Sequence, residues 1–291
     1  MNHIILLDKL YESGIHPTLW SIVKDLYSGL TSKVKWQGEL SRQFGIYQGV
    51  RQGGILSPFL YKTYINLCLV ELKEQKLGLL IGQVYCGSPT CADDLALLSQ
   101  CENELQIMAN VVNRHSKQDR VTIHPDRSNA VLLNKSRTFL KKSFTLKLNE
   151  KDIPLSPSTT HLGLLRSESN ENVINIEERL KLAMRTLYAL ITTGVHGSNG
   201  LNPRVSYRIY QCYVIPRLLF GLEVLPVTST QLNLLTKFHV DNLKRFQSLP
   251  VRTATCAVYL LLGALPVEAE LHKRQLSLLY NILVSSNETI K

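Results

Sequence analysis

The chain contains the stretch Gly49-Val50-Arg51-Gln52-Gly53-Gly54-Ile55-Leu56-Ser57-Pro58, followed further along by Cys91-Ala92-Asp93-Asp94. The first stretch is a glycine-rich loop that leads into apolar residues at helical spacing, from Phe59 to Glu74. The second stretch sets two adjacent carboxylates inside the apolar segment Thr90 to Leu98, which predicts strands around a turn. The sequence therefore predicts a helix N-terminus at the first stretch and an acidic turn at the second.

The neighbouring side chains of Asp93 and Asp94 are candidate metal ligands. Mg²⁺ prefers oxygen donors and is often held by one or two carboxylates together with substrate phosphates. Neighbouring residues on a flat strand point to opposite faces, whereas in a hairpin turn both carboxylates can approach one site. The alternative is a plain solvated turn, because aspartate is a common turn residue.

The glycine-rich loop is a candidate nucleotide or template site. Gly53 lets the backbone approach a bulky ligand, Arg51 offers a fork for phosphate, and the Gln52 amide can read a base edge. Ser57 is the expected N-cap of the following helix, with Pro58 at its first position, and a helix N-terminus favours phosphate. The alternative is an ordinary loop that enters a helix.

The rest of the sequence predicts an α+β fold followed by helices. Helices are expected over residues 6–11, 19–27, 59–74, 103–115, 173–192, 203–219, 230–249 and 267–285. Strands are expected over residues 33–43, 84–86, 90–98, 121–133 and 144–148. The tract 166–172 has no apolar residue, so we expect it to separate an α+β region, 1–165, from an all-helical region, 172–291.

Composition narrows the class of protein. Lys and Arg total 33 against 23 Asp and Glu, and the net charge of +10 favours a nucleic-acid partner over a membrane surface. The 6 cysteines show no metal-binding spacing and lie mostly in apolar runs, which is typical of a reduced, intracellular protein, nuclear or cytoplasmic. No signal peptide or membrane anchor is expected, because the apolar runs are too short.

The two stretches together resemble the palm of the reverse transcriptases of non-LTR retrotransposons, the long interspersed element type. That family shows Gly-x-Arg-Gln-Gly-x-x-Leu-Ser-Pro-x-Leu and, about forty residues later, Ala-Asp-Asp. Ile123-His124-Pro125-Asp126-Arg127-Ser128 resembles the next palm motif, with Arg127 in place of its lysine. His161-Leu162-Gly163 resembles the hairpin that grips the primer, and the helical tail from Glu177 is similar to the thumb.

The resemblance implies RNA-directed DNA polymerisation on an RNA/DNA primer–template, with Mg²⁺ held by the catalytic Asp93 and Asp94. It implies nucleotide or template contacts for Arg51, Gln52, Gly53 and Arg127, and a primer grip at His161, Leu162 and Gly163. It also implies a truncated palm, an antiparallel sheet backed by helices, over residues 1–165, and a thumb-like region over 172–291.

Two departures from the family pattern affect this expectation. Cys91 stands where the family has tyrosine. The first palm motif matches only in its tail, Leu6-Leu7-Asp8-Lys9-Leu10, so its metal-binding aspartate would fall just before Met1. We therefore expect an N-terminally truncated palm that does not polymerise alone, because two-metal phosphoryl transfer depends on that carboxylate.

Basic residues recur on the expected late helices and could follow a duplex backbone. They are Arg179, Lys181, Arg185, Arg204, Arg208, Arg217, Lys244, Arg245 and Arg252. For each one alone, a solvated helix face is the simpler interpretation. The competing functions are a non-catalytic nucleic-acid-binding remnant and a decayed retroelement product without function.

Overall fold

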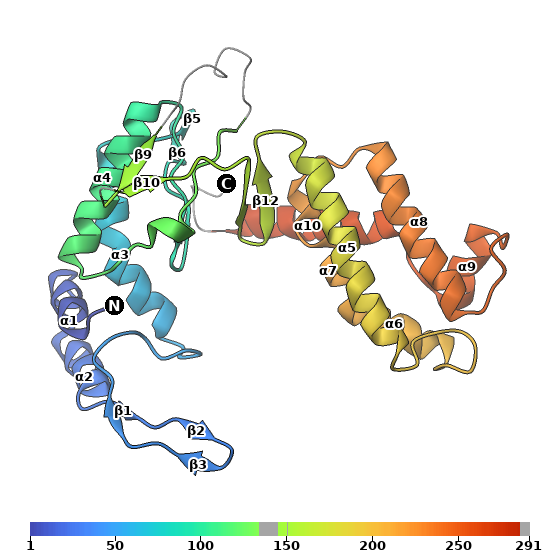
Figure 1. Ribbon diagram of the computed structural model, residues 1–291, viewed down its shortest axis with the longest axis horizontal. Helices are drawn as coiled ribbons and strands as arrows, with labels where there is room; N and C mark the ends of the chain where they lie inside the picture. The colour runs from blue at the N-terminus through green and yellow to red at the C-terminus, as the bar shows by residue number, and fades with distance from the viewer. Residues whose placement is uncertain (134–144, 150, 286–291) are drawn as a thin grey trace. The chain divides into compact units, whose positions relative to one another are not determined.

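The computed structural model describes residues 1–133, 145–149 and 151–285. Contacts divide the chain into two units, with unit 1 formed by residues 1–130 and 138–156 and unit 2 by 131–137 and 157–291. Unit 1 mixes helices and short strands, and unit 2 is mainly helical (Figure 1). This mixture agrees with the predicted α+β class.

Four helices form the framework of unit 1, and all four were predicted. They are α1 (His3–Glu12), α2 (Pro17–Tyr27), α3 (Ser57–Glu74) and α4 (Glu102–Gln118). One apolar cluster joins α1, α2 and α3 through Leu6, Leu10, Val23, Leu60 and Tyr64. A second cluster joins α3 to α4 through Leu72 and Met108, which are both fully buried.

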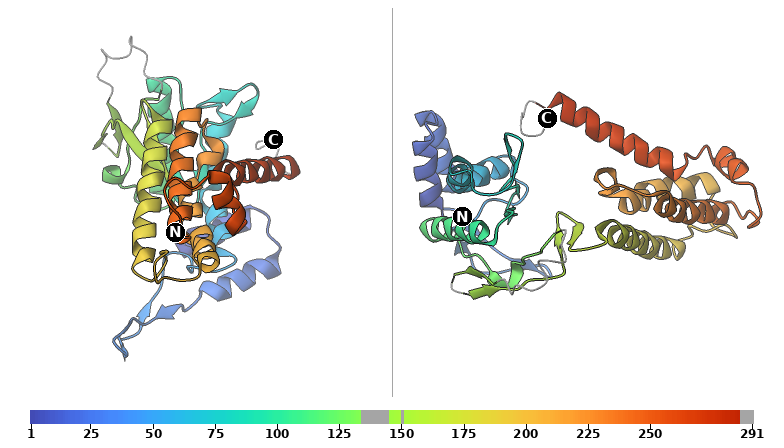
Figure 2. Two further views of the ribbon diagram at one scale, coloured as in Figure 1. Left: turned by 90° about the vertical axis from the view of Figure 1, so that its right-hand side faces the viewer. Right: turned by 90° about the horizontal axis from the view of Figure 1, so that it is seen from above.

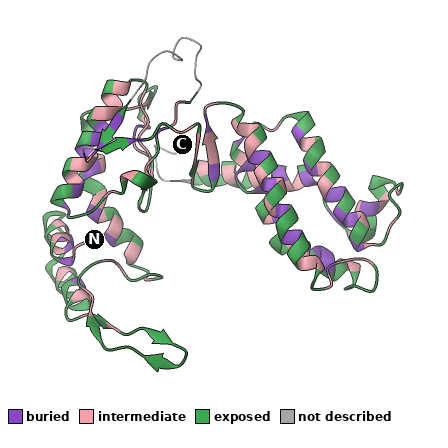
Figure 3. Cartoon of the chain, viewed as in Figure 1, coloured by how far each residue is buried: buried purple, intermediate pink, exposed green. Residues whose placement is uncertain are grey.

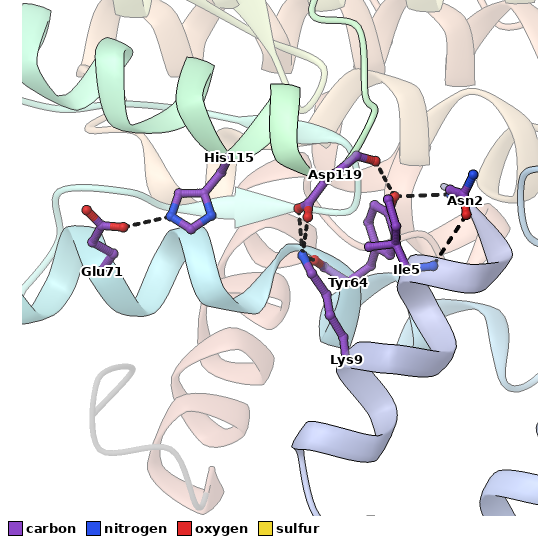
Figure 4. A network of polar contacts seen from close by, with 7 residues as sticks. All are labelled: Asn2, Ile5, Lys9, Tyr64, Glu71, His115 and Asp119. Atoms are coloured by element: carbon purple, nitrogen blue, oxygen red, sulfur yellow. Dashed lines mark hydrogen bonds and ion pairs between the residues drawn. The ribbon is translucent and has the colours of Figure 1, made fainter.

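A buried polar network also ties α1, α3 and the end of α4 together (Figure 4). The Lys9 ammonium lies 2.6 Å from both carboxylate oxygens of Asp119 and donates to the Tyr64 carbonyl oxygen, also at 2.6 Å. The Tyr64 hydroxyl donates to the Asp119 carbonyl oxygen and accepts from the backbone N–H of Asn2. Unit 1 is therefore held by paired polar groups as well as by apolar packing.

The strands of unit 1 pair as antiparallel hairpins. They are β1 (Thr31–Ser32), β2 (Lys35–Trp36), β3 (Glu39–Leu40), β4 (Phe44–Gly45), β5 (Leu80–Ile81), β6 (Val84–Tyr85), β7 (Thr90–Cys91), β8 (Asp94–Leu95), β9 (Leu146–Leu148) and β10 (Lys151–Ile153). Among the described residues they pair only in twos, β1 with β4, β2 with β3, β5 with β6, β7 with β8 and β9 with β10. The structure thus shows small antiparallel sheets instead of one continuous sheet.

The strand predicted over residues 121–133 is wrong. Residues 121–124 have no regular secondary structure, and a 3-10 turn follows at η1 (Pro125–Arg127). The physical reason is Pro125, which has no N–H to donate to a strand neighbour and favours a turn. Only Ala130 forms an isolated bridge, with Leu155. Of the strand expected at residues 144–148, Leu146–Leu148 is present and residue 144 lies outside the described residues.

Unit 2 packs its helices around one apolar core. The helices are α5 (Glu171–Ile191), α6 (Pro203–Tyr213), α7 (Ile215–Leu219), α8 (Ser229–Phe246), α9 (Thr255–Leu262) and α10 (Val267–Val284), with a 3-10 turn η3 (Leu222–Val224). Helices α5 and α8 lie side by side (Figure 2), and buried residues line their facing sides (Figure 3). Tyr210, Leu218, Leu235 and Phe246 are fully buried in this core.

Two features of unit 2 differ from the predicted helices. The single helix expected over 203–219 is divided at Val214 into α6 and α7. Pro216 explains the break, because it lacks an N–H and its ring clashes with the preceding turn. Helix α9 was missed, because its residues are almost uniformly apolar and carry no helical period.

Regular structure occupies both ends of the polar tract 166–172, and the expected boundary there stays a prediction. Its first residues end β12 (Leu164–Ser167), which pairs with β11 (Ser158–His161), and Glu171 begins α5. The Arg166 guanidinium lies 2.6 Å from the Glu171 carboxylate, so the tract turns tightly from the hairpin into the helix. The contacts divide the chain earlier, at residues 156 and 157. No helix in the described ranges is long and apolar enough to cross a membrane.

Candidate functional site

Asp93 and Asp94 lie at the tip of the hairpin β7–β8. The register pairs Cys91 with Asp94, so Ala92 and Asp93 form the turn, and both aspartates are exposed. Ala92 has φ 53°, in the left-handed region that costs an alanine about 1 kcal/mol or more. Backbone strain of this kind often marks functional turns. Two adjacent carboxylates are thus presented to solvent at one strained turn.

Backbone hydrogen bonds hold the base of this hairpin. The N–H of Leu98 donates to the Gly87 carbonyl at 2.8 Å, and the N–H of Leu79 donates to the Leu98 carbonyl at 2.8 Å. A Cβ on Gly78, which has φ +108°, would meet the Leu98 oxygen at 2.7 Å. The close approach that glycine permits here joins the hairpin to the segment after α3.

The glycine-rich loop is anchored at one end and exposed in the middle. The N–H of Gly49 donates to the Met1 carbonyl at 2.8 Å, and His3 Nε2 donates to the Gly49 carbonyl at 2.9 Å. The Ser57 hydroxyl donates to the Arg51 carbonyl at 2.6 Å, closing a turn. The side chains of Arg51 and Gln52 are exposed and available to a ligand.

The start of α3 differs in detail from the prediction. Ser57 is the first helical residue and not the N-cap, which is Leu56, and no side chain bonds the first N–H groups there. The Ser57 hydroxyl instead donates a hydrogen bond to the Arg51 carbonyl oxygen. The Ser57 N–H donates to the Gly54 carbonyl at 3.1 Å and Pro58 has no N–H, so the helix dipole is the main feature that favours an anion at this end.

Tyr61, on the helix that follows the loop, is near enough to the acidic hairpin for Asp93 to affect its pKa, and no sequence pattern indicated this. Burial raises the pKa of the Tyr61 phenol, and the nearby Asp93 carboxylate raises it further. Tyr61 lies one turn into α3, three residues before the buried Tyr64. The charge of Asp93 is therefore felt on the helix that the glycine-rich loop begins.

Arg127 lies at the end of the 3-10 turn η1 and is exposed. Within the described residues it forms no ion pair with Asp93 or Asp94. The same residues hold no group of three or more His, Cys, Asp or Glu side chains arranged to bind a metal ion.

The segment His161-Leu162-Gly163 forms the turn of the hairpin β11–β12 in unit 2. His161 pairs with Leu164, and Leu162 and Gly163 have φ 50° and 78°, as a tight two-residue hairpin turn requires. The Asn175 amide bonds both the N–H and the carbonyl of Leu165, at 2.9 and 2.8 Å. The turn therefore stands on a hairpin fixed to α5.

Arg179 corrects the prediction of a phosphate-contacting residue at that position. Its side chain is buried, its guanidinium donates to the Gly163 carbonyl, and it lies 5.1 Å from the centre of the Phe220 ring. Burial lowers the pKa of Arg179, against the opposing charges of Glu178 and Glu223. Arg179 supports the hairpin turn and does not face solvent.

Other predicted basic residues remain at the surface of unit 2. Arg204 and Arg208 are exposed one turn apart on α6, and with Cys212 and Tyr213 they line an open groove of about 420 Å³. Arg217 is exposed but donates to the Thr186 hydroxyl at 2.7 Å. The α6 groove is thus the best candidate contact surface for phosphate in this unit.

Comparison with known proteins agrees with these features. Residues 1–158 of the 291 match the family described as reverse transcriptase (RNA-dependent DNA polymerase), and the chain belongs to that family. Its relatives place it with the reverse transcriptases of non-LTR retrotransposons.

Three relatives show how far the likeness extends. The Pol polyprotein of the type-1 retrotransposable element R2 from Popillia japonica is 23% identical over 271 residues, 89% of this chain and 36% of the relative. The RNA-directed DNA polymerase from the mobile element jockey of Drosophila funebris is 22% identical over 248 residues, 82% of this chain and 26% of the relative. The R2DM polyprotein of Drosophila melanogaster is 27% identical over 108 residues, 37% of this chain and 10% of the relative. The chain therefore spans about a third or less of each relative.

Proposed function

We propose that this chain forms the metal- and nucleotide-binding part of an RNA-directed DNA polymerase, with a palm-like unit 1 and a thumb-like unit 2. The observation that carries the proposal is the pair of adjacent, exposed carboxylates of Asp93 and Asp94 at the tip of the β7–β8 hairpin. In addition to burial, the nearby Asp93 charge raises the pKa of Tyr61, which lies on the helix begun by the glycine-rich loop.

The residues at the turn fit one Mg²⁺ ion. Two adjacent, exposed carboxylates supply oxygen donors, and Mg²⁺ commonly completes its shell with water and substrate phosphates. Bound there, the ion supplies charge neutralisation to the phosphates during phosphoryl transfer. Arg51 contacts phosphate, Gln52 contacts a base edge, and the dipole at the N-terminus of α3 favours the negative charge. Arg127 takes the place of the family lysine.

The first prediction is that the 291-residue polypeptide alone does not extend a primer. Two-metal phosphoryl transfer needs ligands that hold both ions, and the described residues offer no cluster of three acidic or other metal-binding side chains. The measurement is extension of a DNA primer on an RNA template with Mg²⁺ or Mn²⁺. Extension above background that disappears in Asp93→Ala would overturn this prediction.

Metal binding is tested separately from activity. Mn²⁺ titration followed by electron paramagnetic resonance should detect a weak site that is lost in Asp93→Asn and in Asp94→Asn. Asp126→Asn is the matched control, because Asp126 is an exposed aspartate in the 3-10 turn η1 of the same unit. Equal Mn²⁺ binding in Asp93→Asn, Asp94→Asn and Asp126→Asn would show that Asp93 and Asp94 do not form a metal site.

We further propose that unit 2 contacts duplex through the α6 groove and the primer through the turn His161-Leu162-Gly163. Arg204 and Arg208 form no ion pair within the described residues, so both guanidinium groups are available to phosphates. This binding does not require catalysis, and it therefore also supports the alternative of a non-catalytic nucleic-acid-binding protein.

The second prediction concerns salt. Binding to primer–template duplex should weaken with salt by about 0.9 log unit per log unit of salt for each phosphate contacted. Arg204→Ala and Arg208→Ala should each reduce that slope by about 1. Lys273→Ala on α10 makes the same charge change in the same unit and serves as the control. An equal effect of Lys273→Ala would mean that net charge, and not the groove, determines binding.

A further inference from the structure

A long two-stranded arm, residues 31–45, projects from unit 1 (Figures 1 and 2). Strands β1 and β4 pair at its base, and β2 and β3 pair at its tip. Between these two pairs, the N–H of Ser41 donates to the Val34 carbonyl at 2.9 Å. Gln37 and Gly38 at the tip have φ 48° and 90°, the signs that a tight hairpin turn needs. The arm is therefore a preformed hairpin.

The arm exposes a tryptophan that the fold does not use. Trp36 is 73% exposed, and its neighbours Val34 and Leu40 are 56% and 63% exposed. These side chains, with Gln37, Glu39 and Ser41, line an open groove, and the arm is coloured as exposed in Figure 3. No apolar cluster of the described residues includes them. Exposed apolar side chains that share one surface, with polar residues around them, often mark a ligand site.

The charge around Trp36 identifies the kind of ligand. Lys33, Lys35 and Arg42 are exposed on the arm against the single carboxylate of Glu39, and no ion pair engages them within the described residues. Aromatic side chains between cations are the usual means of binding single-stranded nucleic acid, because bases stack on the ring while cations contact phosphates. A duplex keeps its bases stacked and offers no free face. A protein partner would have to cover a narrow ribbon with three like charges.

We propose that the arm binds single-stranded nucleic acid, with a base stacked on Trp36 and phosphates held by Lys33, Lys35 and Arg42. RNA and DNA share this chemistry, since every base has a stacking face. The site is separate from the acidic hairpin and from the α6 groove, so it does not depend on the proposed polymerase or duplex-binding roles.

The test uses the full chain and unpaired pyrimidine oligonucleotides of RNA and of DNA. Trp36→Ala should weaken binding of the single strand by about 5- to 150-fold, the range that one base–aromatic stack gives. Leu19→Ala, which removes an exposed apolar side chain from α2 of the same unit and lies outside the groove, should change the affinity by less than about twofold. Duplex binding should stay the same in both variants.

A second readout does not depend on a loss of affinity. The chain has 2 tryptophans, so in a Trp20→Phe background the fluorescence reports Trp36 alone and should be quenched when the single strand binds. Unchanged single-strand affinity in Trp36→Ala, or no quenching at saturation, overturns the proposal whatever the duplex assay gives. The proposal would also be overturned if Trp36→Ala changed the oligomeric state seen in sedimentation but left the affinity for the single strand unchanged. The arm would then be a contact between copies of the chain.

Discussion

Replacing Lys9 by methionine is expected to lower the free energy of unfolding of unit 1 by about 3–5 kcal/mol. The reason is that Asp119, whose side chain is 10% exposed, would stay buried as a carboxylate without its cation. The Tyr64 carbonyl would also lose a donor. The measurement is urea unfolding followed by tryptophan fluorescence, because Trp20 and Trp36 both lie in unit 1.

Two further variants separate the buried pair from a general effect of charge removal. Arg114→Met removes the Arg114–Glu71 pair, whose arginine side chain is 50% exposed, and should cost at most about 1 kcal/mol. The double variant Lys9→Met with Asp119→Leu should recover most of the loss, because no unpaired buried charge remains. A loss in Lys9→Met no larger than that in Arg114→Met would show that Asp119 is not buried as the structure has it.

The elements that could be predicted from the sequence are those with a local signal. The helices α1 to α4 carry apolar residues at helical spacing, and the turn at Asp93 lies between short apolar strands. The hairpin turn at Leu162 and Gly163 was expected from the family resemblance and is present. The strand prediction failed at residues 121–133, because Pro125 prevents the strand that the apolar residues there suggested.

The parts that could not be predicted depend on pairings between distant segments. Lys9 and Asp119 are 110 residues apart, and nothing near either residue indicates the other. Arg179 looked like a surface cation on an amphipathic helix, and only the docking of β11–β12 onto α5 buries it. The effect of Asp93 on the pKa of Tyr61 likewise links residues that are far apart in the sequence. The functional roles of Asp93, Asp94 and the loop residues stay predictions, since they depend on ligands.

Acidification is expected to destabilise unit 2 through one buried histidine. His239 is 1% exposed, and burial lowers its pKa from 6.5 to about 4, against a smaller opposing effect of its hydrogen bond to the Leu265 carbonyl. Its Nε2 lies 3.1 Å from that oxygen, and its Nδ1 lies 3.1 Å from the Tyr210 hydroxyl. The neutral ring satisfies both contacts, donating from Nε2 to the carbonyl and accepting at Nδ1.

Whether unit 2 becomes more or less stable on acidification depends on which state, folded or unfolded, binds the proton on His239. Below pH 6.5 the histidine of the unfolded chain takes up a proton, while the folded one stays neutral down to about pH 4. The unfolded state therefore binds more protons in this window, and stability falls as the pH falls, by about 3 kcal/mol across it. Above pH 6.5 the histidine adds no pH dependence.

The measurement is urea unfolding between pH 7 and pH 4, followed by circular dichroism for both units and by tryptophan fluorescence for unit 1 alone. His239→Gln is the matched variant, because glutamine keeps a donor and an acceptor but does not titrate. The variant should be less stable at pH 7 and should lose most of the pH dependence assigned to unit 2. Carboxylates that titrate in the same range are common to both proteins, so they cancel in the difference. An equal pH dependence in both proteins would mean that His239 is accessible to protons in the folded state, which the burial of its ring against Tyr210 and Tyr259 opposes.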